Sequence, residues 1–88
     1  MTIGELIKDK DYDYVEYRIT LPEKVGGGDT FFGSFKVKKG KIIPNDGDCY
    51  NPDEEVVSYE EWSSGKIKKG LTIVVKKDFV LRGNVLLV

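Results

Sequence analysis

The chain contains no histidine, no alanine and no glutamine, and its only cysteine is Cys49. Histidine is the usual general base and the commonest metal ligand in proteins, so this chain lacks both. A Ser-His or Cys-His catalytic pair is therefore excluded. A single thiol cannot form an internal disulfide, which makes a reducing cytoplasm the expected location. We expect a protein that is not an enzyme and needs no cofactor.

Long apolar runs are also missing. The longest is Val85-Leu86-Leu87-Val88, which is far too short to span a bilayer. Charged residues interrupt the N-terminal stretch, so no signal peptide is predicted and no membrane association is expected. The 88 residues are 40% hydrophobic and 33% charged, which is typical of a single small globular domain spanning residues 1–88.

The residues that are present favour strands. Without alanine the chain has little intrinsic preference for helix, whereas valine, isoleucine, tyrosine and phenylalanine are frequent. Thr2-Ile3-Gly4-Glu5 fits a capping box, which predicts a short helix ending near Asp11. Alternating patterns and turn signals predict strands over 12–21, 30–38, 41–43, 55–62 and 71–77, and one or two short strands within 79–88. The expected fold is α+β, mainly an antiparallel sheet, open or curled into a small barrel, with a short N-terminal helix.

The alternation also predicts which side chains are buried. It places Tyr12 and Tyr14 on one face of the first strand and Val15 and Tyr17 on the other. Residues 59–64 allow two interpretations, a strand or a helical turn capped by Ser58, and the β-branched lead-in favours the strand. The predicted core consists of Val15, Tyr17, Ile19, Phe31, Phe35, Val37, Trp62, Ile73 and Val75.

An acidic stretch is the main functional candidate. Residues 46–62 contain seven carboxylates and neither lysine nor arginine. A calcium loop starting at Asp46 would place Tyr50, Asn51 and Val57 where ligands or a glycine are needed, so no metal site is expected. One interpretation is a solvated strand that faces a lysine-bearing neighbour across the sheet. The alternative is an interaction surface formed by Asp46, Asp48, Asp53, Glu54, Glu55, Glu60 and Glu61.

Lysines gather in two other places. Four lie within 36–41 and three within 66–69, each group at or beside a predicted turn. Such lysines usually keep sheet edges from pairing, and they could hold phosphates only if both turns reached one face. The aromatic strand over 30–37 departs at Ser34-Phe35 from the spacing of base-stacking sheets, so core packing is the favoured role. We therefore do not expect nucleic-acid binding.

Three segments carry a resemblance to a known group of proteins. The segments "LIKDKDYDYVEYRITLP", "GDCYNPDEEVVSYEEWSS" and "GLTIVV" resemble short, uncharacterised proteins of Gram-positive gut bacteria that look like mobile-element or prophage cargo. The resemblance covers about residues 1 to 78, and the tail from Phe79 departs from it. It implies a biological setting and no catalytic or binding residues.

Two functions from different classes follow as hypotheses. The favoured one is a small, non-enzymatic cytoplasmic protein that acts by binding another protein. The alternative is an acidic mimic of nucleic acid that inhibits a host nuclease or another DNA-binding enzyme, which requires the carboxylates to lie exposed in a row and free of cationic partners. The apolar C-terminal strand at 85–88 additionally suggests a homodimer formed by pairing or packing of that strand.

Overall fold

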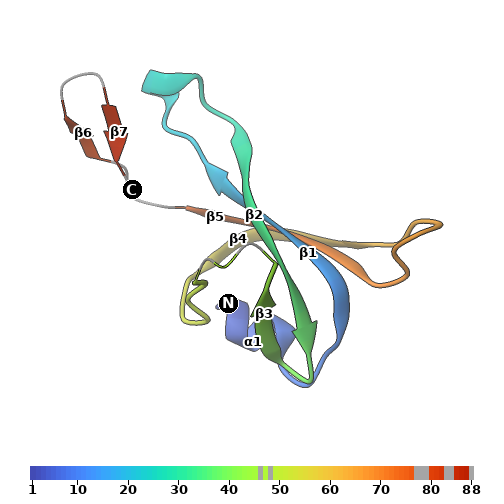
Figure 1. Cartoon of the computed structure of the whole chain (residues 1–88). Coiled ribbons are helices and arrows are strands. Elements are labelled where there is room, and N and C mark those ends of the chain that lie inside the picture. The colour runs from blue at the N-terminus through green and yellow to red at the C-terminus, as the bar shows by residue number, and fades with distance from the viewer. Residues whose placement is uncertain (46, 48, 77–79, 83–84, 88) are drawn as a thin grey trace.

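One short helix and a five-stranded sheet make up the body of the molecule (Figure 1). The computed structural model describes residues 1–45, 47, 49–76, 80–82 and 85–87. The elements are α1 (Ile3–Ile7), β1 (Tyr12–Thr20), the 3-10 turn η1 (Glu23–Val25), β2 (Asp29–Lys38), β3 (Lys41–Pro44), β4 (Val56–Trp62), β5 (Gly70–Lys76), β6 (Val80–Arg82) and β7 (Val85–Leu87). The α+β prediction with a short N-terminal helix is confirmed.

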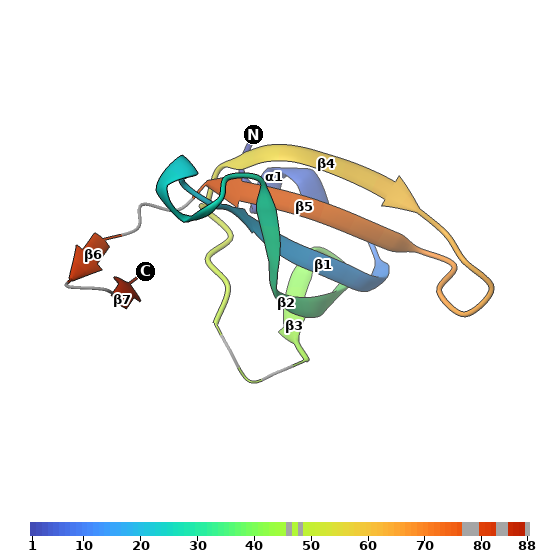
Figure 2. The same cartoon turned by 90° about the horizontal axis from the view of Figure 1, so that it is seen from above.

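The sheet has the order β3-β2-β1-β5-β4 and stays open. Every neighbouring pair is antiparallel except β1 and β5, which run parallel with Tyr14 opposite Gly70. The outer strands β3 and β4 do not pair with each other, so the alternative of a closed barrel is wrong (Figure 2). The parallel pair lies at the middle of the sheet and joins segments far apart in the sequence.

The helix begins with the predicted capping box. The amide of Glu5 donates to Thr2 Oγ1 at 3.1 Å, and the amide of Thr2 donates to Glu5 Oε1 at 2.9 Å. The bond from the Thr2 backbone amide lowers the pKa of the Glu5 carboxyl. The helix ends at Ile7, before the predicted Asp11: Lys8 already leaves the helical conformation with ψ 126°, and Asp9 follows in a left-handed conformation with φ 57°. No helix in the described part of the chain has the length and apolar character needed to cross a membrane.

Helix α1 packs on one face of the sheet and closes the core. Seven of the nine predicted core residues are buried, and the two exceptions are Phe31 and Trp62. The core also includes side chains that the sequence pattern left out, notably those of α1 and Tyr12. The buried set is Ile3, Leu6, Ile7, Tyr12, Val15, Tyr17, Ile19, Phe35, Val37, Leu71, Ile73 and Val75.

Two register shifts between β1 and β2 explain the differences on these strands. The first lies between Tyr12 and Val15 and turns Tyr12 toward the core, although strict alternation placed it with Tyr14. The second lies between Tyr17 and Arg18 and sets Phe31 opposite Arg18. Phe31 is consequently half exposed, and its prediction as a core residue is wrong.

Trp62 is only partly buried because it lies on the face of the sheet away from the core cluster. Its ring covers Gly70 on the neighbouring strand, where an added Cβ would come within 2.6 Å of the indole. The indole Nε1–H donates to Thr72 Oγ1 at 2.9 Å, and the ring meets Tyr14 edge-on at 6.2 Å between centroids. Thr72 in turn donates to Glu16 Oε1 at 3.3 Å. Trp62 therefore anchors a hydrogen-bonded cluster instead of the core.

Most of the remaining strand predictions are confirmed. Residues 56–62 form a strand, which confirms that interpretation over the helical turn. Strand β4 faces β5 in an antiparallel pair as expected, but the acids of β4 do not face lysines, because Glu60 pairs with Thr72 and Glu61 pairs with Leu71. The two short C-terminal strands are confirmed and pair with each other as β6 and β7. A homodimer through this hairpin stays a prediction.

Candidate functional site

The ends of β1, β2 and β5 meet at one end of the sheet. Strand β5 runs parallel to β1 and starts at Gly70, beside the start of β1. Strand β2 runs antiparallel to β1, so its end lies there too, with Val37 opposite Tyr12. The β2–β3 turn and the loop over residues 63–69 therefore reach the same end of the molecule.

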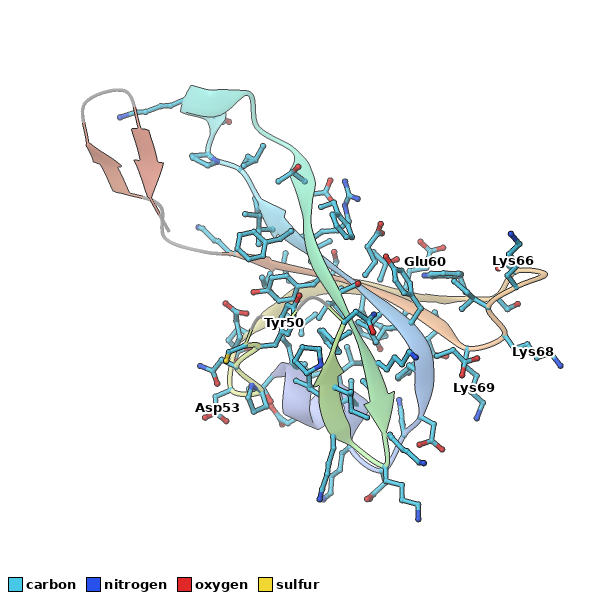
Figure 3. The ribbon with its side chains drawn as sticks, in the orientation of Figure 1. Tyr50, Asp53, Glu60, Lys66, Lys68 and Lys69 are labelled. Atoms are coloured by element: carbon cyan, nitrogen blue, oxygen red, sulfur yellow. The ribbon has the colours of Figure 1, made fainter. Side chains whose placement is uncertain are left out.

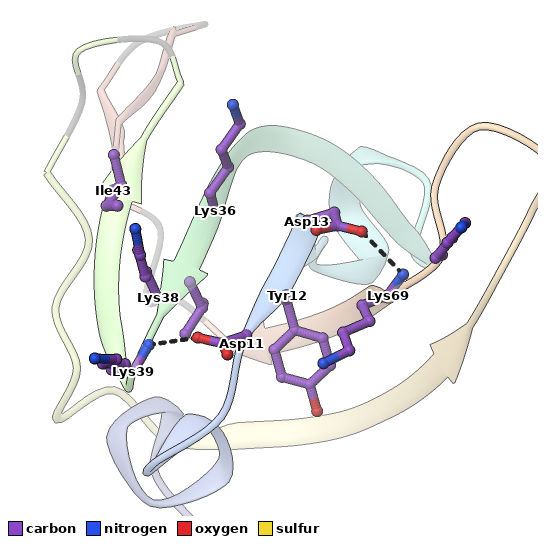
Figure 4. A pocket seen from close by; sticks show the side chains of 10 residues that line it. Asp11, Tyr12, Asp13, Lys36, Lys38, Lys39, Ile43 and Lys69 are labelled. Atoms are coloured by element: carbon purple, nitrogen blue, oxygen red, sulfur yellow. Dashed lines mark hydrogen bonds between the residues drawn. The ribbon is translucent and has the colours of Figure 1, made fainter.

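A surface hollow of about 590 Å³ lies at this end, within the range of natural ligand pockets (Figure 4). Lysines from β2 and its turn stand on one side, lysines of the loop before β5 stand on the other, and two aspartates lie between them. We call this the lysine hollow. It is lined by Lys36, Lys38, Lys39, Lys68, Lys69, Asp11, Asp13, Tyr12, Val37 and Ile43.

The two aspartates hold backbone amides of the lysine-bearing segments. Asp11 Oδ1 accepts the amide of Lys39 at 2.7 Å, and Asp13 Oδ2 accepts the amide of Lys69 at 3.3 Å. The amide of Asp13 also donates to the Lys69 carbonyl at 2.8 Å. These bonds tie both lysine segments to the start of β1.

The ammonium groups of the lysine hollow have no ionic partner among the residues that the structure describes. The ion pairs among the described residues involve the N-terminus, Lys10 and Arg18 instead. Five lysines against two aspartates leave the lysine hollow with a formal charge of about +3, although the whole chain carries −1. This positive charge is available to an anionic ligand.

The tight turn between β2 and β3 sets the position of Lys38 and Lys39. Lys39 and Gly40 both have positive φ, at 50° and 77°, which is the geometry of a two-residue hairpin turn. A Cβ on Gly40 would come within 3.0 Å of the Asp9 amide nitrogen, so the turn also needs glycine for close packing on the chain before β1. The predicted hairpin at Lys39-Gly40 is confirmed.

Tyr12 forms the floor between the lysine hollow and an adjoining one that reaches Glu61. Its hydroxyl donates to Glu61 Oε1 at 2.6 Å, and Lys10 Nζ lies 3.9 Å from the same oxygen. Burial, followed by the bond to Glu61, raises the pKa of Tyr12 well above its ordinary value. Tyr12 therefore stays neutral at physiological pH and serves as a structural link from β1 to β4.

Among the acidic residues singled out in the sequence that the structure describes, Asp53 and Glu60 lie in different parts of the molecule (Figure 3). Asp46 and Asp48 lie outside the described residues. Figure 3 places Asp53 on the opposite side of the molecule from the loop that carries Lys66, Lys68 and Lys69. The described residues contain no group of three or more acidic or thiol side chains arranged to hold a metal ion.

Three of the remaining carboxylates have partners within the chain. Glu54 accepts a hydrogen bond from the hydroxyl of Tyr17, and Glu55 pairs with the N-terminal ammonium at 3.0 Å. Glu61 accepts from Tyr12, whereas Glu60 is exposed on β4. Mimicry of nucleic acid needs a row of free carboxylates. Glu54, Glu55 and Glu61 do not supply one.

Comparison with known proteins adds no functional assignment. The chain matches no protein-family model, and neither the curated proteins nor the solved structures provide a match to it.

Proposed function

We propose that this protein is a small, non-enzymatic cytoplasmic binding protein that holds an acidic segment of another protein in the lysine hollow. One observation carries the proposal. Five lysines from two separate parts of the chain line a single hollow, and their ammonium groups are unpaired among the described residues. An acidic ligand is the complement of such a surface.

The lining supports a peptide over a phosphate chain. Ile43 is 46% exposed and offers apolar surface that suits an apolar side chain of a peptide, whereas Val37 is almost fully buried. Asp11 and Asp13 lie between the lysines and would repel a continuous run of phosphates passing across them. A peptide can instead place its carboxylates over the lysines and neutral residues over the aspartates.

The expected strength follows from the exposure of the lysines. A solvent-exposed ion pair contributes about 0.2–1 kcal/mol, so five of them provide roughly 1–5 kcal/mol in total. Contacts with the exposed side chain of Ile43 must supply the rest of a useful affinity. We therefore expect moderate affinity that falls as salt concentration rises.

Fluorescence polarisation with a labelled peptide tests the proposal. The probe is a synthetic peptide of Glu-Glu-Leu repeats, and its Gln-Gln-Leu analogue reports on the role of charge. Replacing Lys36, Lys38, Lys68 and Lys69 with glutamine should weaken binding of the acidic probe by about tenfold or more. A double variant of two lysines outside the lysine hollow, Lys8→Gln with Lys24→Gln, provides a charge-matched control. It should change the affinity for the acidic probe less than about twofold. The double variant Lys68→Gln with Lys69→Gln removes the same charge from the lysine hollow and should change the affinity more.

Two results would contradict the proposal. Equal binding by the control and lysine-hollow variants would show that the acidic peptide does not bind the charges of the lysine hollow. Tighter binding of a single-stranded oligonucleotide than of the acidic peptide, lost in the same lysine variants, would identify the lysine hollow as a nucleic-acid site.

A further inference from the structure

The two outer strands of the sheet differ in how well they resist pairing. Strand β3 spans four residues and carries Lys41 at one end and Pro44 at the other. Short length, lysine and proline are the usual means by which a sheet edge avoids adding another strand. Strand β4 spans seven residues, VVSYEEW, with none of these features. By composition β4 is the edge that is open to a partner.

The chain already adds an extended segment to the beginning of this edge. Thr2 forms an antiparallel bridge with Glu55, and the amide of Val56 donates to the Met1 carbonyl at 2.8 Å. The amide of Ile3 donates to the Glu54 carbonyl at 2.9 Å. Among the described residues, nothing continues this pairing along β4 beyond Val56. The stretch from Val57 to Trp62 therefore presents an unused edge directly after a used one.

The side chains along this stretch indicate the chemistry of a partner. Val57 is 60% exposed and Tyr59 is 49% exposed, so the edge offers apolar side chains to a partner. Glu60 is an exposed acid in the same strand, whereas Glu61 beside it already accepts a hydrogen bond from Tyr12 and pairs with Lys10. Opposite charges across a strand pair stabilise it, whereas like charges destabilise it. A second copy of β4 would bring further glutamates to this edge, and a strand with basic side chains would complement it.

We propose that the edge of β4 from Val57 to Trp62 binds an extended, basic segment of a partner protein, which adds to the sheet as a further antiparallel or parallel strand. The partner segment carries lysine or arginine residues alternating with β-branched residues. Backbone hydrogen bonds to the edge supply affinity, and the contacts with Tyr59 and Glu60 supply selectivity. This surface is distinct from the lysine hollow, and its partner has the opposite charge.

Amide hydrogen exchange measured by NMR on the full chain tests the proposal. The probe is a synthetic peptide of alternating lysine and valine, and the control is the same peptide N-methylated at every second residue, which removes its backbone donors and keeps its charge. The unmodified peptide should slow exchange of outward-facing amides within 57–62, and the methylated one should bind at least about tenfold more weakly.

A pair of variants isolates the edge. Tyr59→Lys introduces a charge that opposes both strand addition and a basic ligand, and it should weaken peptide binding about tenfold. Phe31→Lys makes a similar change at an exposed aromatic side chain of β2, so it should leave binding within about twofold. Equal binding of the methylated peptide, or equal effects of the two variants, would overturn the proposal. So would sedimentation showing a dimer whose β4 amides are protected without peptide, since the edge would then be occupied by a second copy.

Discussion

The two faces of the five-stranded sheet are held together by different kinds of interaction. On the face covered by α1, the side chains of Val15, Tyr17, Phe35 and Ile73 have almost no solvent exposure. On the opposite face, hydrogen bonds link Trp62 to Thr72 and Thr72 to Glu16. Burial acts without direction and scales with area, whereas these hydrogen bonds depend on geometry and partly exchange with water. Comparable substitutions should therefore lower the free energy of unfolding far more on the covered face than on the opposite face.

The largest effect is expected for Phe35→Ala on the covered face. Phe35 is fully buried, and its removal leaves a cavity in a small core, which should lower the free energy of unfolding by about 3–5 kcal/mol. Phe31→Ala lies in the same strand at a half-exposed position and should cost about 1 kcal/mol or less. Urea unfolding of both variants measures the difference. Similar midpoints would mean that the two faces are not distinct in the way described.

Gly70→Ala tests the opposite face. The backbone tolerates alanine there, but the new methyl would lie 2.6 Å from the Trp62 ring and force it off Thr72. We expect a loss of about 1–3 kcal/mol, as for other overpacked sites. Trp62 is the only tryptophan, so its fluorescence should shift to longer wavelength in the folded variant. An unchanged emission spectrum would show that the ring does not rest on Gly70.

Tyr17→Phe removes a hydroxyl on the covered face. Loss of the hydrogen bond to Glu54 should lower the free energy of unfolding by about 1–2 kcal/mol near neutral pH. Burial raises the pKa of Tyr17 above its unfolded value of about 10, so the folded state keeps its proton longer than the unfolded state. Stability from this residue is complete below about pH 10 and is lost as pH rises further. Thermal melts between pH 8 and about 11.5 should fall more steeply for the wild type than for Tyr17→Phe; parallel curves would contradict this linkage.

The smallest effect is expected for Asp29→Asn at the rim of the uncovered face. Asp29 pairs with Arg18 at 2.8 Å and is 44% exposed. Their hydrogen bond raises the pKa of Arg18, but an exposed ion pair contributes only about 0–1 kcal/mol to folding. The expected change in the free energy of unfolding is below about 1 kcal/mol and disappears in high salt. A loss as large as that of Gly70→Ala would place this pair among the determinants of the fold.

Local patterns predicted the elements of this fold better than their arrangement. The capping box, the Lys39-Gly40 turn and the strand over 56–62 depend on neighbouring residues, and all are confirmed. The faces of Tyr12 and Phe31 depend on register shifts between two strands, which no alternation within one strand can reveal. Trp62 lies outside the predicted core because it is on the other face of the sheet, where its ring covers Gly70 of the neighbouring strand.

The candidate site was predictable in its residues and not in its geometry. Both lysine groups can be identified in the sequence, and phosphate binding was expected only if the two groups converged on one face. Their convergence depends on the parallel pairing of β1 with β5, a contact between residues 56 positions apart that leaves no trace in local composition. The acidic stretch can also be identified in the sequence. Its partners Tyr12, Tyr17 and the N-terminus could not be predicted, because they come from distant parts of the chain.

The same parallel pair has a consequence for folding on the ribosome. Strands β1, β2 and β3 are consecutive antiparallel neighbours and can form once residues up to Pro44 have emerged. The second edge of β1 must then wait for β5, which ends at Lys76. Pairings between distant residues form slowly, and an unpaired edge recruits other chains. A nascent chain that stalls before Gly70 therefore exposes what becomes the centre of the sheet, and we expect such a chain to be prone to aggregate.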